Sequence, residues 1–289
     1  MRRATLSLFA MLFLLFSASP AVAEGIVESF EKGRIDWSSG EVIASGLHAP
    51  TRKGDESITP DEQSHFEKRA VRAARANLST ILRRLTIQGN IMGRDAIGNN
   101  SDILAQLDLI FLSTPVVSKK FLTDGSVEVA IALPLKGPFS QLILPEEIRQ
   151  INPITPIAQT GDEKATPTPS TYTGLVVDAR GVAVTPALAP RVVTETGEEV
   201  YGPTVISREH AVQRGVAIYV PSFSASGKSG SAGENPLVVT GIGTVQGTTT
   251  DVVISSADAA KLRSDPGHTA FLSQCRVVFV VDAPKPVAP

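Results

Sequence analysis

A proline-rich segment in the middle of the chain, residues 151–172, limits the possible folds more than any other feature. Prolines at positions 153, 156, 167 and 169 alternate there with threonine, glycine and charged residues. Proline lacks an amide hydrogen and fixes its φ angle, so this composition is typical of a semi-rigid linker rather than a packed element. The segment therefore predicts two globular parts, residues 25–150 and 173–283, with a short tail at 284–289.

The first 23 residues have the pattern of a cleavable secretory signal. Two arginines follow the initial methionine, and residues 6–16 are apolar except for one serine. This run is shorter than the ~20 residues that cross a bilayer core. Ala21 and Ala23 then form the small–x–small motif that signal peptidase cleaves. The pattern predicts export by the general secretory route, and an uncleaved anchor is the alternative.

Cysteine usage limits how the exported chain is attached and cross-linked. Glu24 stands at the first mature position, where a lipoprotein needs a cysteine, so no N-terminal lipid anchor is predicted. Cys275 is the only cysteine, which excludes an internal disulfide. It lies in an apolar, strand-like run at 274–281, which favours a buried, inert thiol. An intermolecular disulfide is the alternative.

The charge balance argues against a nucleic-acid partner. Removal of the two signal arginines leaves 25 basic against 29 acidic side chains, a net charge near −4. Nucleic-acid-binding domains are expected to be basic. The mature chain also has no second apolar run of membrane-spanning length, so no membrane-spanning segment is expected after signal cleavage.

The first part has the pattern of helices packed on one face of a mostly antiparallel sheet. Thr59 as N-cap, Pro60 at the first helical position and two acidic residues after it predict a long helix that ends near Leu85. Its apolar residues recur every three or four positions and share one face: Phe66, Ala70, Ala74, Leu78, Ile81, Leu82 and Leu85. After a glycine-rich loop, a second helix is expected from Ser101 to Phe111.

Strands are expected in both parts. In the first part they lie at 33–37, 41–46, 85–88, 115–121 and 126–133, with a hairpin turn at Asp124–Gly125. In the second part they lie at 174–178, 191–193, 215–220, 236–240, 250–254 and 275–281. Two short helices, 207–212 and 255–262, each open with a serine cap, and residues 222–233 form a flexible loop. The fold class is therefore α+β, with a β-rich α/β second domain.

The sequence predicts no catalytic, cofactor-binding or metal-ligating residues. The four histidines, His48, His65, His210 and His268, have neither the spacing of metal ligands nor a cysteine nearby. Gly227-Lys228-Ser229 is similar to the end of a phosphate-binding loop, but Ser222 stands where that motif needs glycine. No G-x-S-x-G nucleophile motif occurs.

Three further features have two interpretations each. Asp178 and Arg180 predict a turn with a local ion pair, and a functional carboxylate is the alternative. Trp37, the only tryptophan, is expected to anchor the core beneath the long helix rather than bind a ligand. The long helix carries basic residues that predict a solvated face, with a basic groove as the alternative. They are Lys68, Arg69, Arg72, Arg75, Arg83 and Arg84.

Several motifs of the first part follow one another in an order found in a known family. They are Gly33–Trp37, Val42–Gly46, the alanine-rich stretch Arg69–Leu78, Asp124–Val129 and Pro134-Leu135. Over residues 30–137 they resemble the small α+β domain of FlgT-type flagellar outer-ring proteins and related outer-membrane lipoproteins. That resemblance implies a non-catalytic domain for envelope and flagellar ring assembly. Residues 173–181 resemble the C-terminal part of uncharacterised exported bacterial proteins that carry the same first domain.

The sequence thus predicts an exported, non-enzymatic protein of the periplasm, with no cofactor. It would be a structural or assembly component, associated with the outer membrane or flagellar basal body. Its partners would be envelope or flagellar proteins, or a second copy of itself. One alternative is an exported hydrolase whose site assembles from distant residues such as Asp178, Glu209 and His210. Another is a module that binds a small ligand or peptidoglycan, which an apolar pocket between the two parts would support.

Overall fold

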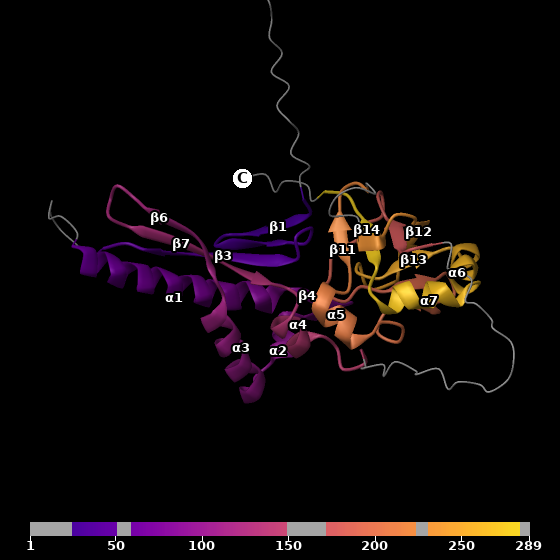
Figure 1. Cartoon of the computed structure of the whole chain (residues 1–289), viewed down its shortest axis with the longest axis horizontal. Helices are drawn as coiled ribbons and strands as arrows, with labels where there is room; N and C mark the ends of the chain where they lie inside the picture. The colour runs from indigo at the N-terminus through magenta and orange to yellow at the C-terminus, as the bar shows by residue number, and fades with distance from the viewer. Residues whose placement is uncertain (1–24, 51–58, 149–171, 224–230, 284–289) are drawn as a thin grey trace, which may run out of the picture.

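The computed structural model describes residues 25–50, 59–148, 172–223 and 231–283. The predicted signal, linker residues 151–171, the segment Gly227–Ser229 and the tail lie outside these ranges. Figure 1 shows an N-terminal part with a sheet and a long helix, joined to a β-rich C-terminal part. The predicted α+β class is confirmed. Among the described residues, no helix combines the length and apolar character needed to cross a membrane.

The N-terminal part contains a five-stranded sheet of order β1-β2-β3-β7-β6. The strands are β1 (Val27–Phe30), β2 (Gly33–Asp36), β3 (Glu41–His48), β6 (Val116–Phe121) and β7 (Val127–Pro134). All neighbouring strands are antiparallel. The Asp124–Gly125 turn joins β6 to β7 as predicted, with Gly125 at φ 81° and the Ser126 amide bound to Asp124 Oδ1 at 2.9 Å. Strand β1 was not predicted.

The long helix α1 (Pro60–Arg84) lies along one face of this sheet (Figure 1). Its start is the predicted one: the Thr59 hydroxyl accepts the Glu62 amide hydrogen, and the Glu62 carboxylate accepts that of Thr59. The predicted apolar positions face the sheet and are buried, except that Phe66 is only partly buried. Local capping and periodicity therefore account for this helix.

The remaining elements of the N-terminal part are short. They are β4 (Thr86–Gln88), β5 (Ile91–Met92), α2 (Gly93–Ile97), α3 (Ser101–Ser113) and α4 (Pro138–Ile143). Strand β4 and helix α3 match the predictions. The expected glycine-rich loop is wrong for residues 91–97, which form β5 and α2. Gly93 permits this arrangement, because a Cβ atom there would lie 1.8 Å from the Leu82 carbonyl oxygen. Helix α4 was also missed.

The C-terminal part contains a seven-stranded mixed sheet of order β10-β9-β13-β12-β8-β14-β11. Strands β12, β8, β14 and β11 run parallel to one another. The bounds are β8 (Leu175–Asp178), β9 (Val192–Thr194), β10 (Glu199–Tyr201), β11 (Ile218–Val220), β12 (Leu237–Thr244), β13 (Val252–Ile254) and β14 (Val277–Val280). The helices are α5 (Arg208–Arg214), α6 (Ser256–Arg263) and α7 (Pro266–Ser273).

Several details of this part differ from the prediction. Residues 215–217 precede β11 rather than belonging to it, and Cys275 precedes β14. The Ser255 hydroxyl caps α6 by accepting the Asp258 amide hydrogen at 3.1 Å, whereas the Ser207 side chain makes no capping hydrogen bond to α5. Strand β10 and helix α7 were not predicted. Their lengths, three and eight residues, leave little periodic signal.

The packing of α1 on β3 gives a testable expectation. A Cβ atom at Gly46 would lie 2.2 Å from the Ala70 carbonyl oxygen and 2.3 Å from the Ala74 amide nitrogen. Gly46→Ala should therefore push the helix from the sheet and lower the free energy of unfolding by about 1–3 kcal/mol. Gly243→Ala in β12 is the matched control, because no atom lies within 4 Å of its Cβ position. Equal urea midpoints for the two variants would contradict this packing.

Candidate functional site

The two parts are joined first by backbone hydrogen bonds. The Leu188 amide donates to the Thr86 carbonyl at 2.9 Å, and the Ala189 amide donates to that of Ile87 at 2.8 Å. A short extended segment of the C-terminal part therefore lies along β4. Buried backbone groups need such partners, so this pairing sets where the two parts meet.

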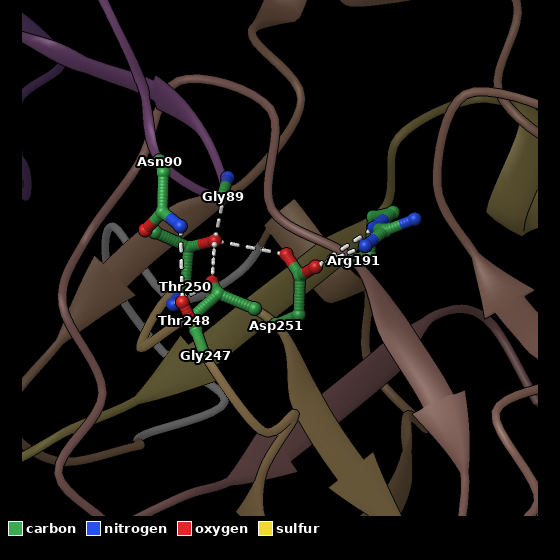
Figure 2. A network of polar contacts seen from close by, with 7 residues as sticks. All are labelled: Gly89, Asn90, Arg191, Gly247, Thr248, Thr250 and Asp251. Atoms are coloured by element: carbon green, nitrogen blue, oxygen red, sulfur yellow. Dashed lines mark hydrogen bonds and ion pairs between the residues drawn. The ribbon is translucent and has the colours of Figure 1, made fainter.

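A polar network lies beside this pairing (Figure 2). In the turn between β4 and β5, the Gly89 amide donates to Thr250 Oγ1 at 2.8 Å. The Asn90 side-chain amide donates to the Gly247 carbonyl at 3.0 Å. Thr250 is buried, and its hydroxyl hydrogen goes to Asp251 Oδ1 at 2.9 Å. One threonine hydroxyl thus links the N-terminal part to a buried carboxylate of the C-terminal part.

That carboxylate, Asp251, has no solvent exposure. Its second oxygen accepts hydrogen bonds from two nitrogens of Arg191, with Nε at 2.9 Å. The carboxylate in turn raises the pKa of the Arg191 guanidinium. A buried charge is stable only when it is paired and hydrogen-bonded. Arg191 and Thr250 meet that requirement, so the network has a structural role.

Arg208 makes a second polar connection between the parts. From α5 its guanidinium donates to carbonyl oxygens at the C-terminal end of α4 and beyond it. The acceptors are Gln141 (2.8 Å), Leu144 (3.4 Å), Pro145 (3.0 Å) and Ile148 (3.2 Å). The last carbonyls of a helix lack partners within it, and a cation there also complements the helix dipole.

Aromatic side chains complete the contact. Trp37 is buried as expected, but its aromatic partner is Tyr219 of the C-terminal part, in an edge-on arrangement with centroids 5.8 Å apart. The neighbouring Ser38 hydroxyl donates to the Tyr219 carbonyl at 2.7 Å. Burial raises the pKa of the Tyr219 phenol, whose hydroxyl donates to the Ala187 carbonyl. Trp37 therefore anchors the junction as well as the core.

A cavity of about 120 Å³ lies between the two parts, next to Trp37. We call it the junction cavity. Its walls are Trp37, Ser38, Ser39, Gly40, Leu135 and Lys136 from the N-terminal part, and Ala187, Leu188 and residues 214–218 from the C-terminal part. Pockets for drug-sized ligands typically measure about 300–1,000 Å³. The junction cavity is therefore large enough for a single functional group rather than a large ligand.

The second candidate is an exposed apolar surface. Of the ten large apolar side chains that are exposed among the described residues, six lie within residues 109–122. We call them the α3–β6 surface: Leu109, Leu112, Val116, Val117, Phe121 and Leu122. Strand β6 is the last strand of its sheet and, within the part of the chain that the structure describes, pairs with β7 alone. The tip of the β6–β7 hairpin lies at the end of the molecule far from the C-terminal part (Figure 1).

Grooves flank α3 on both sides. One, of about 390 Å³, is lined by residues of α1 and α3 that include Arg75 and Leu112. The other, of about 650 Å³, lies between α3 and α4 and includes Leu109. The Arg75 guanidinium donates to the Leu112 carbonyl at 3.1 Å. Sequence reasoning missed this surface, although the apolar run in residues 109–117 was a signal for it.

The residues suggested for a hydrolase do not come together. Asp178 ends β8 and forms the predicted local ion pair with Arg180, with Nε 2.8 Å from Oδ1, which lowers the pKa of its carboxyl. Glu209 accepts a hydrogen bond from Gln213 within α5. Helix α5, which also carries His210, leads into the start of β11, a strand parallel to β8. Asp178, at the C-terminal end of β8, therefore lies at the opposite end of these parallel strands from α5.

The buried Nε2 of His268 has no hydrogen-bond partner among the described residues. His268 is buried near the rings of Tyr172 and Phe271, with Nδ1 3.1 Å from the Lys261 carbonyl oxygen. No cluster of three or more potential metal ligands occurs within the described ranges. Of the six basic residues of α1, four are exposed, as predicted for a solvated face: Lys68, Arg69, Arg72 and Arg84.

Cys275 is buried as predicted, in the loop before β14, with φ at 56°. Burial raises the pKa of its thiol to about 12, and the nearby Tyr201 hydroxyl offsets this in part. The thiol therefore stays protonated in the folded chain at neutral pH.

One part of the chain is similar to a domain of a known protein. Residues 174–283 match a family model described as the second domain of Treponema pallidum Tp0624. The matched segment corresponds to the C-terminal part, so this part is similar to that domain. No curated protein sequence matches the chain.

The network around Thr250 should respond to a nearly isosteric change. Thr250→Val removes the acceptor of the Gly89 amide and the donor to Asp251, so the free energy of unfolding should fall by about 1–3 kcal/mol. Hydrogen exchange of the Gly89 amide should accelerate. Thr249→Val, at the exposed neighbouring position, removes only a solvent-exposed hydrogen bond to Thr185 at 2.8 Å and should change stability by less than about 0.5 kcal/mol. Unchanged Gly89 exchange would refute the proposed link.

The thiol of Cys275 should be unreactive in the folded chain. With its pKa near 12, against 9.0 for a free cysteine, the thiolate is roughly a thousandfold rarer at pH 8. A colorimetric thiol reagent should therefore label the native protein at least a thousandfold more slowly than the protein in denaturant. Rapid native labelling, or a disulfide-linked dimer on a non-reducing gel, would instead favour the intermolecular bridge.

Proposed function

We propose that this chain is an exported, non-enzymatic component of the bacterial cell envelope that acts through protein–protein contacts. Its role would be structural or in assembly, at the outer membrane or flagellar basal body. The observation that carries the proposal is the α3–β6 surface. Six of the large exposed apolar side chains gather within residues 109–122, and groups of exposed apolar side chains often mark interaction sites.

The free edge of β6 strengthens this argument. Sheet edges are commonly protected by charged side chains, above all lysine. Strand β6 has Lys119 and Lys120, but these lysines form ion pairs with Glu67 and Glu128 of the same chain. Val117 and Phe121 remain 55% and 51% exposed on this strand. An extended segment of a partner would satisfy the unpaired backbone groups and cover these side chains.

Two sequence features support the location and the class of partner. The predicted secretory signal places the mature chain outside the cytoplasm. The N-terminal motifs resemble domains of flagellar outer-ring proteins and outer-membrane lipoproteins. Envelope or flagellar proteins, or a second copy of the chain, are therefore the expected partners.

Two double variants, each with threonine at two exposed apolar positions, test this surface. When the mature wild-type protein is cross-linked in envelope fractions and isolated, a defined partner should be recovered with it. Val117→Thr with Phe121→Thr should reduce that recovery at least tenfold, because both apolar contacts are lost. The control is Val238→Thr with Ile242→Thr, which changes two equally exposed residues of β12 and should recover the partner in full.

Three outcomes would contradict the proposal. The first is a monomer that recovers no partner, and the second is an equal loss of recovery in both double variants. The third is substrate turnover by the purified protein that stops when a single side chain is replaced, which would contradict the non-enzymatic role.

A further inference from the structure

The junction cavity has a charge pattern that the contact function does not require. Among the described residues, two ionisable side chains line it, Lys136 and Arg214, and both are cations. Lys136 lies just after β7, and Arg214 is the last residue of α5, so each part of the chain supplies one. Both side chains are exposed, and neither forms an ion pair with a described residue.

No acidic side chain of the cavity wall neutralises these cations. Asp36 precedes the turn that forms one wall, but its Oδ1 accepts the amide hydrogens of Ser38 and Ser39, at 3.0 and 2.9 Å. A helix dipole alone would explain a cation at the end of α5. It does not explain Lys136, which belongs to the other part and lies on the same cavity.

The size and the remaining walls restrict what the cavity accommodates. Its volume of about 120 Å³ is small beside the roughly 300–1,000 Å³ of pockets for drug-sized ligands. That space suits one carboxylate or phosphate group with a few attached carbon atoms. Trp37, Leu135 and Leu188 provide apolar surface for those carbons. Ligand sites commonly combine such walls with a few charged groups, and they occur often between domains.

We propose that the junction cavity binds a small oxyanion, the carboxylate or phosphate group of a ligand, with Lys136 and Arg214 as the charge partners. This site goes beyond the proposed contact function, which needs no ligand. Because both parts form the cavity, the anion binds only when they are docked. Binding therefore stabilises the docked arrangement in proportion to anion concentration.

Trp37 provides a direct readout, because it is the only tryptophan and it lines the cavity. The mature protein is titrated at constant ionic strength with propionate and, separately, with inorganic phosphate, while tryptophan emission is recorded. A saturable change is expected with at least one anion, and sodium chloride should give none. Propionate and phosphate distinguish the two possible sources of the oxyanion.

Three variants test the residues. Lys136→Ala and Arg214→Ala should each weaken binding roughly tenfold, the typical loss for one charge-assisted hydrogen bond. Both side chains are exposed, so the melting temperature without anion should fall by no more than about 4 °C, the most that loss of one helix-end cation would cause. Arg69→Ala is the matched control, because Arg69 is exposed on the first half of α1, away from the junction (Figure 1).

The outcomes separate clearly. Saturable binding that both cavity variants weaken and the control leaves unchanged supports the site. The absence of a saturable change with either anion would overturn it. So would equal affinities in Lys136→Ala, Arg214→Ala and the wild type. None of these results depends on the α3–β6 surface, so either proposal can be disproved while the other stands.

Discussion

The buried carboxylate of Asp251 is the constraint on which the arrangement of the two parts depends. A charge without solvent exposure must be paired, and Arg191 and the Thr250 hydroxyl provide its partners. The same Thr250 oxygen accepts the Gly89 amide hydrogen from the other part. The hydrogen bonds that stabilise the Asp251 carboxylate therefore also position the β4–β5 turn. The backbone pairing of β4 with Leu188 and Ala189 lies next to that turn and is positioned with it. The walls of the junction cavity follow from that position.

The junction also explains how the chain presents its surfaces. One continuous apolar core includes residues of both parts, so the parts share buried area as well as polar contacts. Arg208 and the Trp37–Tyr219 pair add contacts at two further points. The β6–β7 hairpin and the start of α1 extend away from this joined region (Figure 1). A protein built for contact would benefit from this form, because the joined region supports an exposed edge some distance away.

The elements that could be predicted are those whose signal is long or chemically specific. Helix α1 has a capping box and seven apolar positions at helical spacing, and the β6–β7 hairpin has an Asp-Gly turn. The elements that were missed, such as α2, α4 and β10, have three to six residues, too few for a period to be recognised. The candidate sites were missed for a different reason. Lys136 and Arg214 are isolated cations in unrelated segments, and no local pattern distinguishes them from other surface charges.

The amino-acid sequence by itself therefore determined the α+β class, the long helix, the hairpin and the burial of Cys275, because each depends on residues close together in the chain. Only the tertiary structure decided that Gly89 meets Thr250, 161 residues away, and that Ser38 meets Tyr219, 181 residues away. Such contacts depend on the shapes of two folded surfaces and on the need to satisfy their buried polar groups. The junction cavity and the exposed edge of β6 also depend on the tertiary structure, because residues of both parts line the cavity and β6 lies at one edge of its sheet.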